Sequence, residues 1–507
     1  MKNKNKSLEE LKMISSKLRK KGKKIVHCHG VFDLLHLGHI RHFEKSKSLG
    51  DVLIVSITHH DFVNKSPNQP YFSTIQRIEM LNSIEVIDYV CVNKNFDATE
   101  LINLIKPSFY CKGADYKIFS EDITGKINDE TKAVESVGGE FIVTDEISFS
   151  SSKLLLTENI IINEDQNFFL KKLKKLNSLD DISNLINNFK NLNILVIGET
   201  IIDEYTYCEA IGKSGKDPFL VLKKLNTERY LGGVLALANN ISEFSNNVSL
   251  VSILGKNKEY YNFIKNNLSK KIKKKFFLKN NSETILKKRF VDKNSNNKVM
   301  GVYNLFDDQV NEKEILKIND YLNKILHKYD LVIVVDYGHG FLSNSTIKLI
   351  TNKSKFLSIN CQVNSSNSGF QSVQKYNKSN ILTINESELR FEMRDKRSKV
   401  EYLVNKLSKK IKFNKCVVTR GSKGALLYDA KKNIFLNCPA FAGKVVDKVG
   451  AGDTFLPFFT FATYLKSNEH LALFLGSVAA ADSVLSIANS KKIKKNKILK
   501  TISHLIK

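Results

Sequence analysis

The stretch HGVFDLLHLGH, residues 29–39, carries three histidines and one aspartate. It overlaps KKIVHCHG, residues 23–30, whose short apolar run is typical of a buried parallel strand. It leads into HIRHFEKSKSLG, residues 39–50, which is typical of a helix. The quoted stretch is therefore the turn between a first strand and a first helix. In an open α/β sheet such a turn lies at the carboxyl end of the strand, where ligands bind.

The residues of this turn permit two kinds of site. His36 and His39 are three residues apart and share a helix face, which would suit a metal ion. Gly38 between them is a poor helix-interior residue and suits a place where backbone or ligand approaches closely. Backbone N–H groups at a helix start, together with imidazole donors, would form a cradle for phosphate. On these residues alone both possibilities stay open.

Strand-like and helix-like segments alternate on both sides of a changed middle region. The run NLNILVIGE, residues 191–199, repeats the pattern of a buried strand ending in glycine and opens a second α/β region. The middle lacks strand signals and has helical periodicity, with Ser178 as the predicted N-cap of a helix. We therefore predict an α/β fold with two doubly wound parallel-sheet domains, at residues 1–157 and 191–507, joined by a linker and helix at 158–190.

A second motif, DKVGAGDTF, occupies residues 447–455. Gly450 and Gly452 flank Ala451 and allow backbone N–H groups to converge at the start of the apolar helix that follows. An anionic oxygen would be held at this helix N-terminus. Asp453 is placed to accept a proton from a substrate hydroxyl. A tight turn with a capping aspartate is the plainer alternative, but it requires neither the second glycine nor the apolar flank.

Composition excludes several classes of protein. The 507 residues carry a net charge of +27, but the lysines are spread along the chain, so we expect no nucleic-acid partner. The densest basic run, residues 269–281, is expected on a solvated helix face or loop. No apolar run reaches the length of a membrane span and no signal sequence is evident, so we expect a cytoplasmic protein without a membrane partner. The seven cysteines form no CxxC pair, which predicts reduced, buried thiols.

The first motif resembles the HxGH nucleotidyltransferase superfamily, in particular its cytidylyltransferase-like branch. The resemblance covers residues 25–157 and implies that His36 and His39 contact the nucleotide triphosphate and stabilise charge at the α-phosphate as pyrophosphate leaves. The other residues that it implies for binding nucleotide or phosphate are Gly30, Phe32, Asp33, Gly38, Lys65, Arg77, Ser150, Ser151 and Ser152. Those that it implies for binding substrate are Lys112 and Asp115.

The second motif resembles the PfkB/ribokinase family, over residues 180–490. The resemblance implies transfer of the ATP γ-phosphoryl group to a sugar hydroxyl, with Asp453 as the base. For substrate it implies Asp203, Gly232 and Gly233. For nucleotide and phosphate it implies Thr419, Gly421, Gly424, Gly450, Ala451 and Gly452, and for Mg²⁺ through water it implies Asn385 and Glu388.

The pair of motifs is similar to the bifunctional heptose enzymes, which are phosphotransferases and nucleotidyltransferases that make an ADP-heptose-like sugar for surface polysaccharide. This implies ATP as phosphoryl donor, ATP or CTP as nucleotidyl donor, Mg²⁺, sugar phosphate substrates and a separate phosphatase between the two steps. A homodimer is a further implied assembly.

Four features keep other substrates open. The transferase motif precedes the kinase motif, Lys448 and residues 212–221 differ from the heptose pattern, and the polar segment 361–376 has no evident physical role. The alternatives are a cytidylyltransferase–kinase acting on another polyol or sugar phosphate, or a chain in which one half only binds ligand. The intact His36, His39 and Asp453 argue against the latter.

Overall fold

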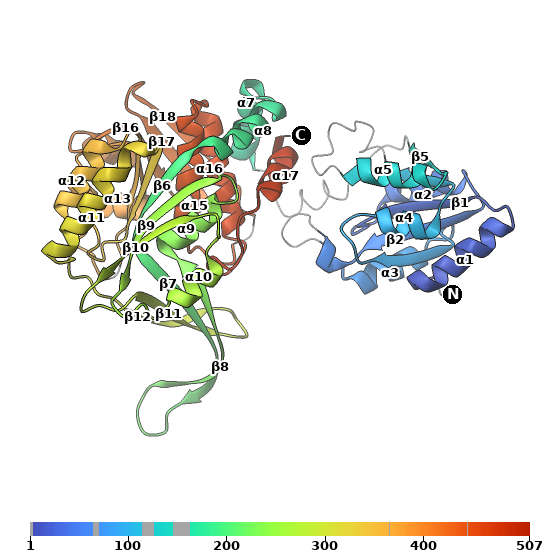
Figure 1. Cartoon of the computed structure of the whole chain (residues 1–507), viewed down its shortest axis with the longest axis horizontal. Helices are drawn as coiled ribbons and strands as arrows, with labels where there is room; N and C mark the ends of the chain where they lie inside the picture. Colours follow the sequence, from blue (N-terminus) through green and yellow to red (C-terminus); the bar gives the residue numbers. More distant parts are fainter. Residues whose placement is uncertain are drawn as a thin grey trace. The chain divides into compact units, whose positions relative to one another are not determined.

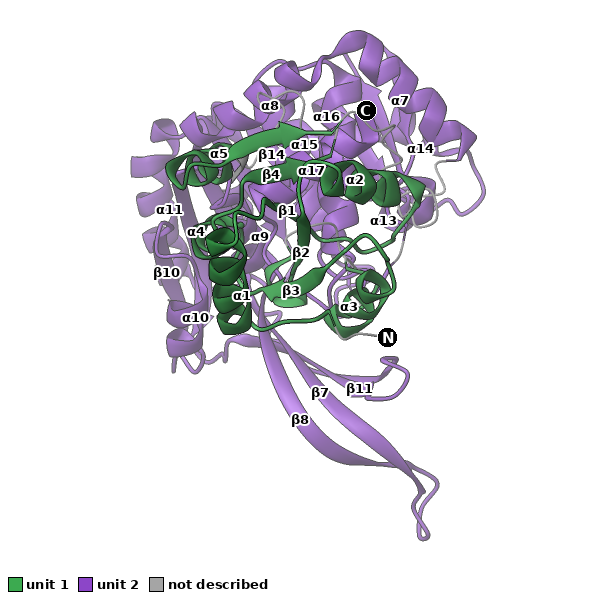
Figure 2. Ribbon diagram, turned by 90° about the vertical axis from the view of Figure 1, so that its right-hand side faces the viewer, with its two compact units in different colours: residues 1–161 green, residues 162–507 purple. Residues whose placement is uncertain are grey.

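The computed structural model describes residues 4–63, 70–113, 126–144, 163–364, 366–443 and 445–506. The chain forms two compact units, unit 1 at residues 1–161 and unit 2 at residues 162–507 (Figure 2).

Unit 1 is built on a parallel five-stranded sheet (Figure 1). Alternate residues of its central strand point to opposite faces, so that Val26 packs in the core with helices α2 and α3 while Ile25 packs with α1 and α4. The elements are α1 (Leu8–Lys20), β1 (Ile25–Gly30), α2 (Leu37–Lys47), β2 (Val52–Thr58), η1 (His60–Phe62), α3 (Thr74–Asn82), β3 (Tyr89–Asn93), α4 (Thr99–Ile105), β4 (Phe109–Lys112), α5 (Lys126–Ser136) and β5 (Glu140–Val143).

The strand order of unit 1, β3-β2-β1-β4-β5, reverses its direction between β1 and β4. The loops at the carboxyl ends of these two strands diverge to opposite faces, which opens a crevice for a ligand. The stretch 29–39 follows β1 and therefore lies at this crevice.

Unit 2 contains a nine-stranded sheet in the order β10-β9-β6-β13-β14-β15-β16-β17-β18. It is parallel from β10 to β16 and ends in two antiparallel strands. The strands are β6 (Asn193–Gly198), β9 (Asn247–Gly255), β10 (Lys273–Lys279), β13 (Leu331–Asp336), β14 (Leu357–Cys361), β15 (Lys378–Asn385), β16 (Lys412–Thr419), β17 (Ala425–Asp429) and β18 (Ile434–Cys438).

The helices of unit 2 pack around this sheet. They are α7 (Glu164–Leu176), α8 (Leu179–Asn188), α9 (Gly233–Ile241), α10 (Tyr261–Asn267), α11 (Glu312–Ile325), α12 (Asn344–Lys353), α13 (Glu386–Met393), α14 (Val400–Ser408), α15 (Ala451–Tyr464), α16 (Glu469–Ser483) and α17 (Lys495–Ile506), with single turns η4 (Phe189–Asn191), η5 (Leu326–Lys328), η6 (Val373–Lys375) and η7 (Gly421–Lys423).

A second, four-stranded sheet in unit 2 has the order β12-β11-β7-β8. Its strands are β7 (Thr200–Lys213), β8 (Leu220–Gly232), β11 (Ile285–Asp292) and β12 (Lys298–Asn304). The long β7–β8 hairpin projects from the body of unit 2 (Figures 1 and 2). The base of β7 carries Asp203, so this sheet places a candidate substrate residue beside the large sheet.

Several sequence predictions are confirmed. Both units have the doubly wound α/β architecture, all seven cysteines are free and buried, and Ser178 is the N-cap of α8, where its side chain accepts the N–H of Asp181. No helix among the described residues is long and apolar enough to cross a membrane.

The prediction for residues 269–281 was wrong. The central part of this run forms β10, an edge strand of the large sheet, whose first three lysines are exposed. Lysine on an edge strand opposes pairing with another chain, so charge in this run protects a sheet edge.

Candidate active sites

In unit 1 the loop after β1 is organised by Phe32 and Asp33. Phe32 adopts a left-handed backbone conformation (φ 46°), and a Cβ at Gly30 would lie 3.0 Å from its ring. The buried Asp33 carboxylate accepts the backbone N–H groups of Tyr71 and Phe72 at 2.6 and 2.8 Å. In this structure Asp33 therefore joins the loop after β1 to the residues that precede α3, and its direct contact with nucleotide stays a prediction.

His36 and His39 lie in the first turn of α2. His36 is the N-cap, where its Nδ1 accepts the N–H of Gly38 at 3.1 Å, and His39 Nδ1 accepts the N–H of His36 at 3.3 Å. The two ring centroids are 3.9 Å apart. A ring nitrogen that accepts a hydrogen bond carries no proton, so this network assigns the proton of each neutral ring to Nε2. Two imidazole donors therefore accompany the helix N-terminus, which suits a phosphate group.

Arg77 is fully buried in α3 and donates to protein oxygens. Its Nη1 contacts the carbonyl oxygens of Val31 (2.8 Å) and Thr58 (2.9 Å), and its Nε contacts that of Phe72 (3.1 Å). Burial lowers the pKa of the guanidinium, and the nearby Asp33 opposes that change. Arg77 therefore supports the ends of β1 and β2 in this structure, and its predicted phosphate contact stays a prediction.

Lys112, at the end of β4, forms a buried ion pair with Glu130 at 3.0 Å and donates to the carbonyl oxygen of His29 at 3.3 Å. Burial would raise the pKa of Glu130, but the Lys112 ammonium together with hydrogen bonds from Ala98 and Tyr110 lowers it. The substrate role implied for Lys112 also stays a prediction. The implied site residues Lys65, Asp115, Ser150, Ser151 and Ser152 lie outside the described residues.

Two further histidines, His29 at the start of the stretch 29–39 and His42 in α2, make buried contacts with hydroxyl groups of other elements. His29 Nδ1 lies 2.8 Å from Ser56 Oγ, and His42 Nδ1 lies 2.8 Å from Thr144 Oγ1. Burial lowers the pKa of His42 to about 4, so its ring is neutral at physiological pH. These two side chains connect neighbouring elements behind the crevice.

In unit 2 the sequence GAGD, residues 450–453, forms the N-terminal end of α15; we call it the GAGD turn. Gly450 is the N-cap in a left-handed conformation (φ 85°), and a Cβ there would lie 2.7 Å from Asn489 Oδ1. The space around Gly452 is open. The turn therefore requires glycine at Gly450 for its conformation and leaves room at Gly452 for a ligand beside the helix N-terminus.

Asp453 lies in the first turn of α15 with a hydrogen bond on each carboxylate oxygen. The Tyr337 hydroxyl donates to Oδ2 and Gln362 Nε2 donates to Oδ1, both at 2.9 Å. Burial raises the pKa of Asp453 to about 6, and the negative charge of Asp203 acts in the same direction. The positive Lys287 and the two hydrogen bonds act against it. A carboxylate with this pKa is ionised at neutral pH but close to its protonation point, which suits a general base.

Asp203 on β7 is held by its neighbours in the small sheet. Arg289 Nη1 lies 2.6 Å from Asp203 Oδ1. Lys287 is the residue of β11 that lies beside Asp203 in the register of β11 and β7. A Cβ at Gly232 would lie 2.3 Å from Asp203 Oδ2, so this position admits only glycine without moving the carboxylate. Gly233 follows with φ 53°, at the start of α9. The small sheet thus places one carboxylate, Asp203, and one cation, Lys287, within electrostatic range of Asp453.

Asn385 and Glu388 begin α13 as a reciprocal capping pair. Each side chain accepts the other residue's N–H, at 2.8 and 2.9 Å, and Glu388 also accepts the N–H of Val363 at 3.2 Å. Burial raises the pKa of Glu388 to about 7. Amide and carboxylate oxygens are ligands that Mg²⁺ accepts, and oxygens already bound to backbone N–H groups fit contact through water.

The loop after β16 carries the predicted nucleotide residues. Thr419 ends the strand in register with Asn385 on β15. Gly421 and Gly424 adopt φ 57° and 82°, and a Cβ at Gly424 would lie 2.0 Å from the Cys438 carbonyl oxygen. The predicted nucleotide residues and the predicted magnesium residues therefore lie at the same edge of the large sheet.

The polar segment 361–376 acquires a physical role in the structure. Asn364 and Asn367 donate to the Tyr337 carbonyl oxygen at 2.8 and 2.7 Å. The buried Asp336 accepts hydrogen bonds from Gln371 (2.9 Å) and Tyr376 (2.7 Å). The segment therefore fixes the loop that carries Tyr337, one of the two residues that contact Asp453.

Comparison with known proteins supports the assignment of a kinase site to unit 2. The family described as "pfkB family carbohydrate kinase" matches residues 191–494. The chain belongs to the pfkB family of carbohydrate kinases. A mutant of phosphofructokinase-2 from Escherichia coli superposes with a TM-score of 0.50 at 13% identity, over 62% of this chain and 100% of that chain, and this likeness shows the fold alone.

The family described as "Cytidylyltransferase-like" matches residues 27–183, which cover most of unit 1 and the first residues of unit 2. A similar protein, "Bifunctional protein HldE" of a Nitratiruptor species, is 39% identical over 137 residues, which are 26% of this chain and 29% of that protein. The protein of the same name from Campylobacter jejuni subsp. doylei is 37% identical over 155 residues, 30% of each chain. The matches thus span less than a third of these relatives. The predicted combination of a cytidylyltransferase-like unit followed by a pfkB kinase unit is confirmed.

Four residues around the kinase site escaped the sequence analysis: Lys287, Arg289, Tyr337 and Gln362. A weak signal existed for the first two, because three consecutive cations interrupt the otherwise apolar strand ILKKRFV. No local signal exists for Gln362, which reaches Asp453 from another strand end.

Proposed function

We propose that this pfkB-family chain is a bifunctional enzyme that phosphorylates a sugar phosphate and transfers a nucleotidyl group to a sugar 1-phosphate. The observation that carries the kinase half is the Asp453 carboxylate, raised in pKa to about 6, beside a helix N-terminus and within electrostatic range of Asp203. The transferase half rests on the Nε2–H donors of His36 and His39 at the start of α2.

In the kinase step, Asp453 accepts the proton of a sugar hydroxyl as the hydroxyl oxygen attacks the γ-phosphorus of ATP and ADP leaves. Asp203 and its cationic neighbours orient the sugar, and the N–H groups from Gly450 to Asp453 bind the charge that develops on the transferred phosphoryl group. Asn385 and Glu388 would hold Mg²⁺ through water, and that ion would neutralise phosphate charge.

In the transferase step, a phosphate oxygen of the sugar 1-phosphate attacks the α-phosphorus of ATP or CTP, and pyrophosphate leaves. The attacking oxygen is already anionic, so this step requires no general base. His36 and His39 donate to the nucleotide's phosphate oxygens and stabilise the charge that grows there. The two histidines therefore act by positioning and electrostatics.

The similarity of unit 1 to proteins named HldE favours a heptose phosphate as substrate, with ATP in both steps. The kinase product would then carry two phosphates, so a separate phosphatase must remove one before the transferase step. The product of the transferase step would then be a nucleotide-activated sugar for surface polysaccharide, made in the cytoplasm. Another polyol or sugar phosphate with CTP is the alternative.

The test supplies purified protein with ATP or CTP and a panel of sugar phosphates, while ADP and pyrophosphate are followed separately. His39→Ala is expected to abolish only pyrophosphate release, and Asp453→Asn only ADP formation. If either substitution abolished both activities in a folded protein, the two-site proposal would be wrong.

We also propose a homodimer. The projecting β7–β8 hairpin exposes Ile211, Phe219 and Leu220, each at 49–64% of full exposure, and apolar side chains on an extended strand pair suit contact with a second copy. Sedimentation of the wild type and of an Ile211→Lys/Phe219→Lys variant tests this, since a dimer should dissociate in the variant.

A further inference from the structure

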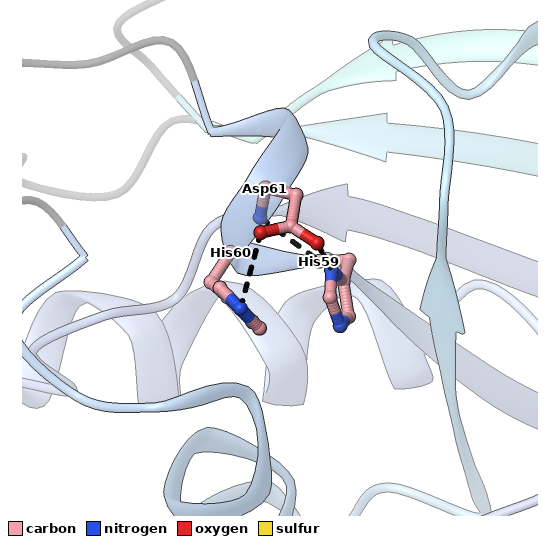
Figure 3. A group of neighbouring side chains, drawn as sticks. All are labelled: His59, His60 and Asp61. Atoms are coloured by element: carbon pink, nitrogen blue, oxygen red, sulfur yellow. Dashed lines mark hydrogen bonds and ion pairs between the residues drawn. The ribbon is translucent and has the colours of Figure 1, made fainter. Parts of the chain in front are cut away.

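Three ligand-type side chains converge just after β2, and none of them is among the residues predicted for either active site. His59, His60 and Asp61 form or precede the single turn η1, and Figure 3 shows both imidazole rings turned toward the Asp61 carboxylate. His59 Nδ1 lies 3.3 Å from Asp61 Oδ2, and His60 Nε2 lies 3.2 Å from Asp61 Oδ1. Among the described parts of the chain, this is the one group of three or more such residues whose ligand atoms all lie within 4.8 Å of one another.

These separations match the geometry of a transition-metal site. Zinc binds imidazole nitrogen and carboxylate oxygen at about 2.0–2.2 Å, so two ligands of one tetrahedral ion lie about 3.3 Å apart. The two nitrogen–oxygen distances, each to a different oxygen of the Asp61 carboxylate, are close to that value. Two imidazoles and one carboxylate favour zinc or a similar ion over Mg²⁺, which prefers oxygen ligands alone.

The ligands are also held in place by residues that would not touch the ion. Thr74 Oγ1 lies 3.1 Å from His60 Nδ1 and accepts the His60 backbone N–H at 3.2 Å, which leaves the Nε2 edge of this ring toward Asp61. The backbone N–H of His59 donates to the Asn93 carbonyl oxygen at the end of β3, at 2.8 Å. An ion on His60 Nε2 would require the ring proton on Nδ1, where Thr74 Oγ1 is the neighbouring oxygen that would accept it.

Charge pairing alone gives a weaker account of the cluster. His60 and Asp61 keep 54% and 66% of their side-chain exposure, and exposed ion pairs contribute only about 0–1 kcal/mol. His59 Nδ1 also caps η1, where it accepts the Asp61 backbone N–H at 3.4 Å, and an ion on this nitrogen would replace that bond. Neither the cap nor an ion pair requires the second imidazole, His60, on the same carboxylate. The same exposure leaves the outer side of the cluster open to water.

We propose that His59, His60 and Asp61 bind one zinc-like transition-metal ion, with water in the remaining coordination position. These residues belong to unit 1 and are not those proposed to hold Mg²⁺ in unit 2. It is linked to the crevice of unit 1, because Thr74 also accepts a hydrogen bond from Arg77, whose guanidinium contacts the Val31 carbonyl oxygen. Binding of the ion would therefore order η1 against α3 beside the crevice.

The test titrates the full chain, after treatment with chelator, with Co²⁺ and follows its visible absorption; Zn²⁺ is then added as competitor. One equivalent is expected to bind with a tetrahedral or five-coordinate spectrum that Zn²⁺ abolishes. His60→Ala and Asp61→Asn are each expected to weaken binding at least about tenfold. His327→Ala, which removes a lone exposed histidine, is expected to leave binding unchanged.

His36→Ala separates this site from the paired histidines of α2. Loss of Co²⁺ binding in His36→Ala, with binding retained in Asp61→Asn, would overturn the proposal, and so would a wild type that binds no stoichiometric ion. Circular dichroism of each variant shows that the fold is intact. The readout is metal binding, so its result does not depend on whether either proposed activity is found.

Discussion

Tyr337→Phe removes one hydroxyl from the kinase site and leaves the ring. That hydroxyl donates to Asp453 Oδ2 at 2.9 Å, and the bond stabilises the ionised carboxylate. Without it, the pKa of Asp453 should rise above its value of about 6. A general base must be ionised, so the acidic limb of the kinase pH profile should move to higher pH.

The size of the change follows from the strength of the lost bond. A hydrogen bond to a charged group contributes about 1.5–3 kcal/mol, and one pKa unit corresponds to about 1.4 kcal/mol. The apparent pKa should therefore rise by about one to two units. For a rise of one unit, the ionised fraction at pH 6 falls from about a half to about a tenth, so kcat falls about fivefold there. Well above the new pKa, wild type and variant should differ little.

The assay is the rate of ADP formation between pH 5 and 9 at saturating ATP and sugar phosphate. Tyr464→Phe is the matched control, because it makes the same change at the far end of the same helix, α15. Its acidic limb should coincide with that of the wild type. An unshifted acidic limb in a folded Tyr337→Phe protein, or a limb displaced to lower pH, would refute the assignment of Asp453 as a base tuned by Tyr337.

Three other predictions concern separate parts of the chain. Gly232→Ala would place a Cβ 2.3 Å from Asp203 Oδ2, so steady-state kinetics should show a raised KM for the sugar substrate and unchanged pyrophosphate release; an unchanged KM would contradict the packing argument. Lys112→Met leaves Glu130 buried without its cation and should lower the free energy of unfolding of unit 1 by about 3–5 kcal/mol. Thermal or urea unfolding of the full chain measures this loss, and the double variant Lys112→Met/Glu130→Leu should recover most of it. Glu388 has a pKa of about 7, so the Mg²⁺ affinity measured from ADP formation should increase as pH rises through 7, and Glu388→Gln should remove this dependence; equal pH dependence in both proteins would exclude Glu388 from the magnesium site.

Much of the architecture was predictable because the relevant signals are local. The turn at residues 29–39 combines a strand end, a glycine and a helix start, and residues 447–455 combine two glycines with a helix start; in both the helix starts at the predicted turn. The basic run at residues 269–281 was misassigned to a helix face or loop. Lysines are typical of solvent-exposed positions in general, and an edge strand also has solvent-exposed positions.

The candidate sites were predictable only in part. Asp453 and Asp203 stood out through their motifs, whereas the family resemblance implied that Arg77 contacts nucleotide or phosphate and that Lys112 contacts substrate. In the structure both are buried and engaged with protein oxygens. Burial depends on residues distant in the chain, such as Glu130 for Lys112, so no local pattern reveals it.

The sequence by itself determined the two α/β units, their order and the chemistry of their loops, since strand periodicity, glycine turns and helix starts are encoded by neighbouring residues. Only the tertiary structure decided which side chains control Asp453. Tyr337 and Gln362 reach it from the ends of different strands, and the polar segment 361–376 fixes the Tyr337 loop. These contacts arise from the order of strands in the sheet, which brings together residues more than ninety positions apart. Contacts between residues so far apart produce no local sequence pattern. Asp453 could therefore be predicted as the base from its motif, whereas Tyr337 and Gln362 could not be predicted as its hydrogen-bond partners.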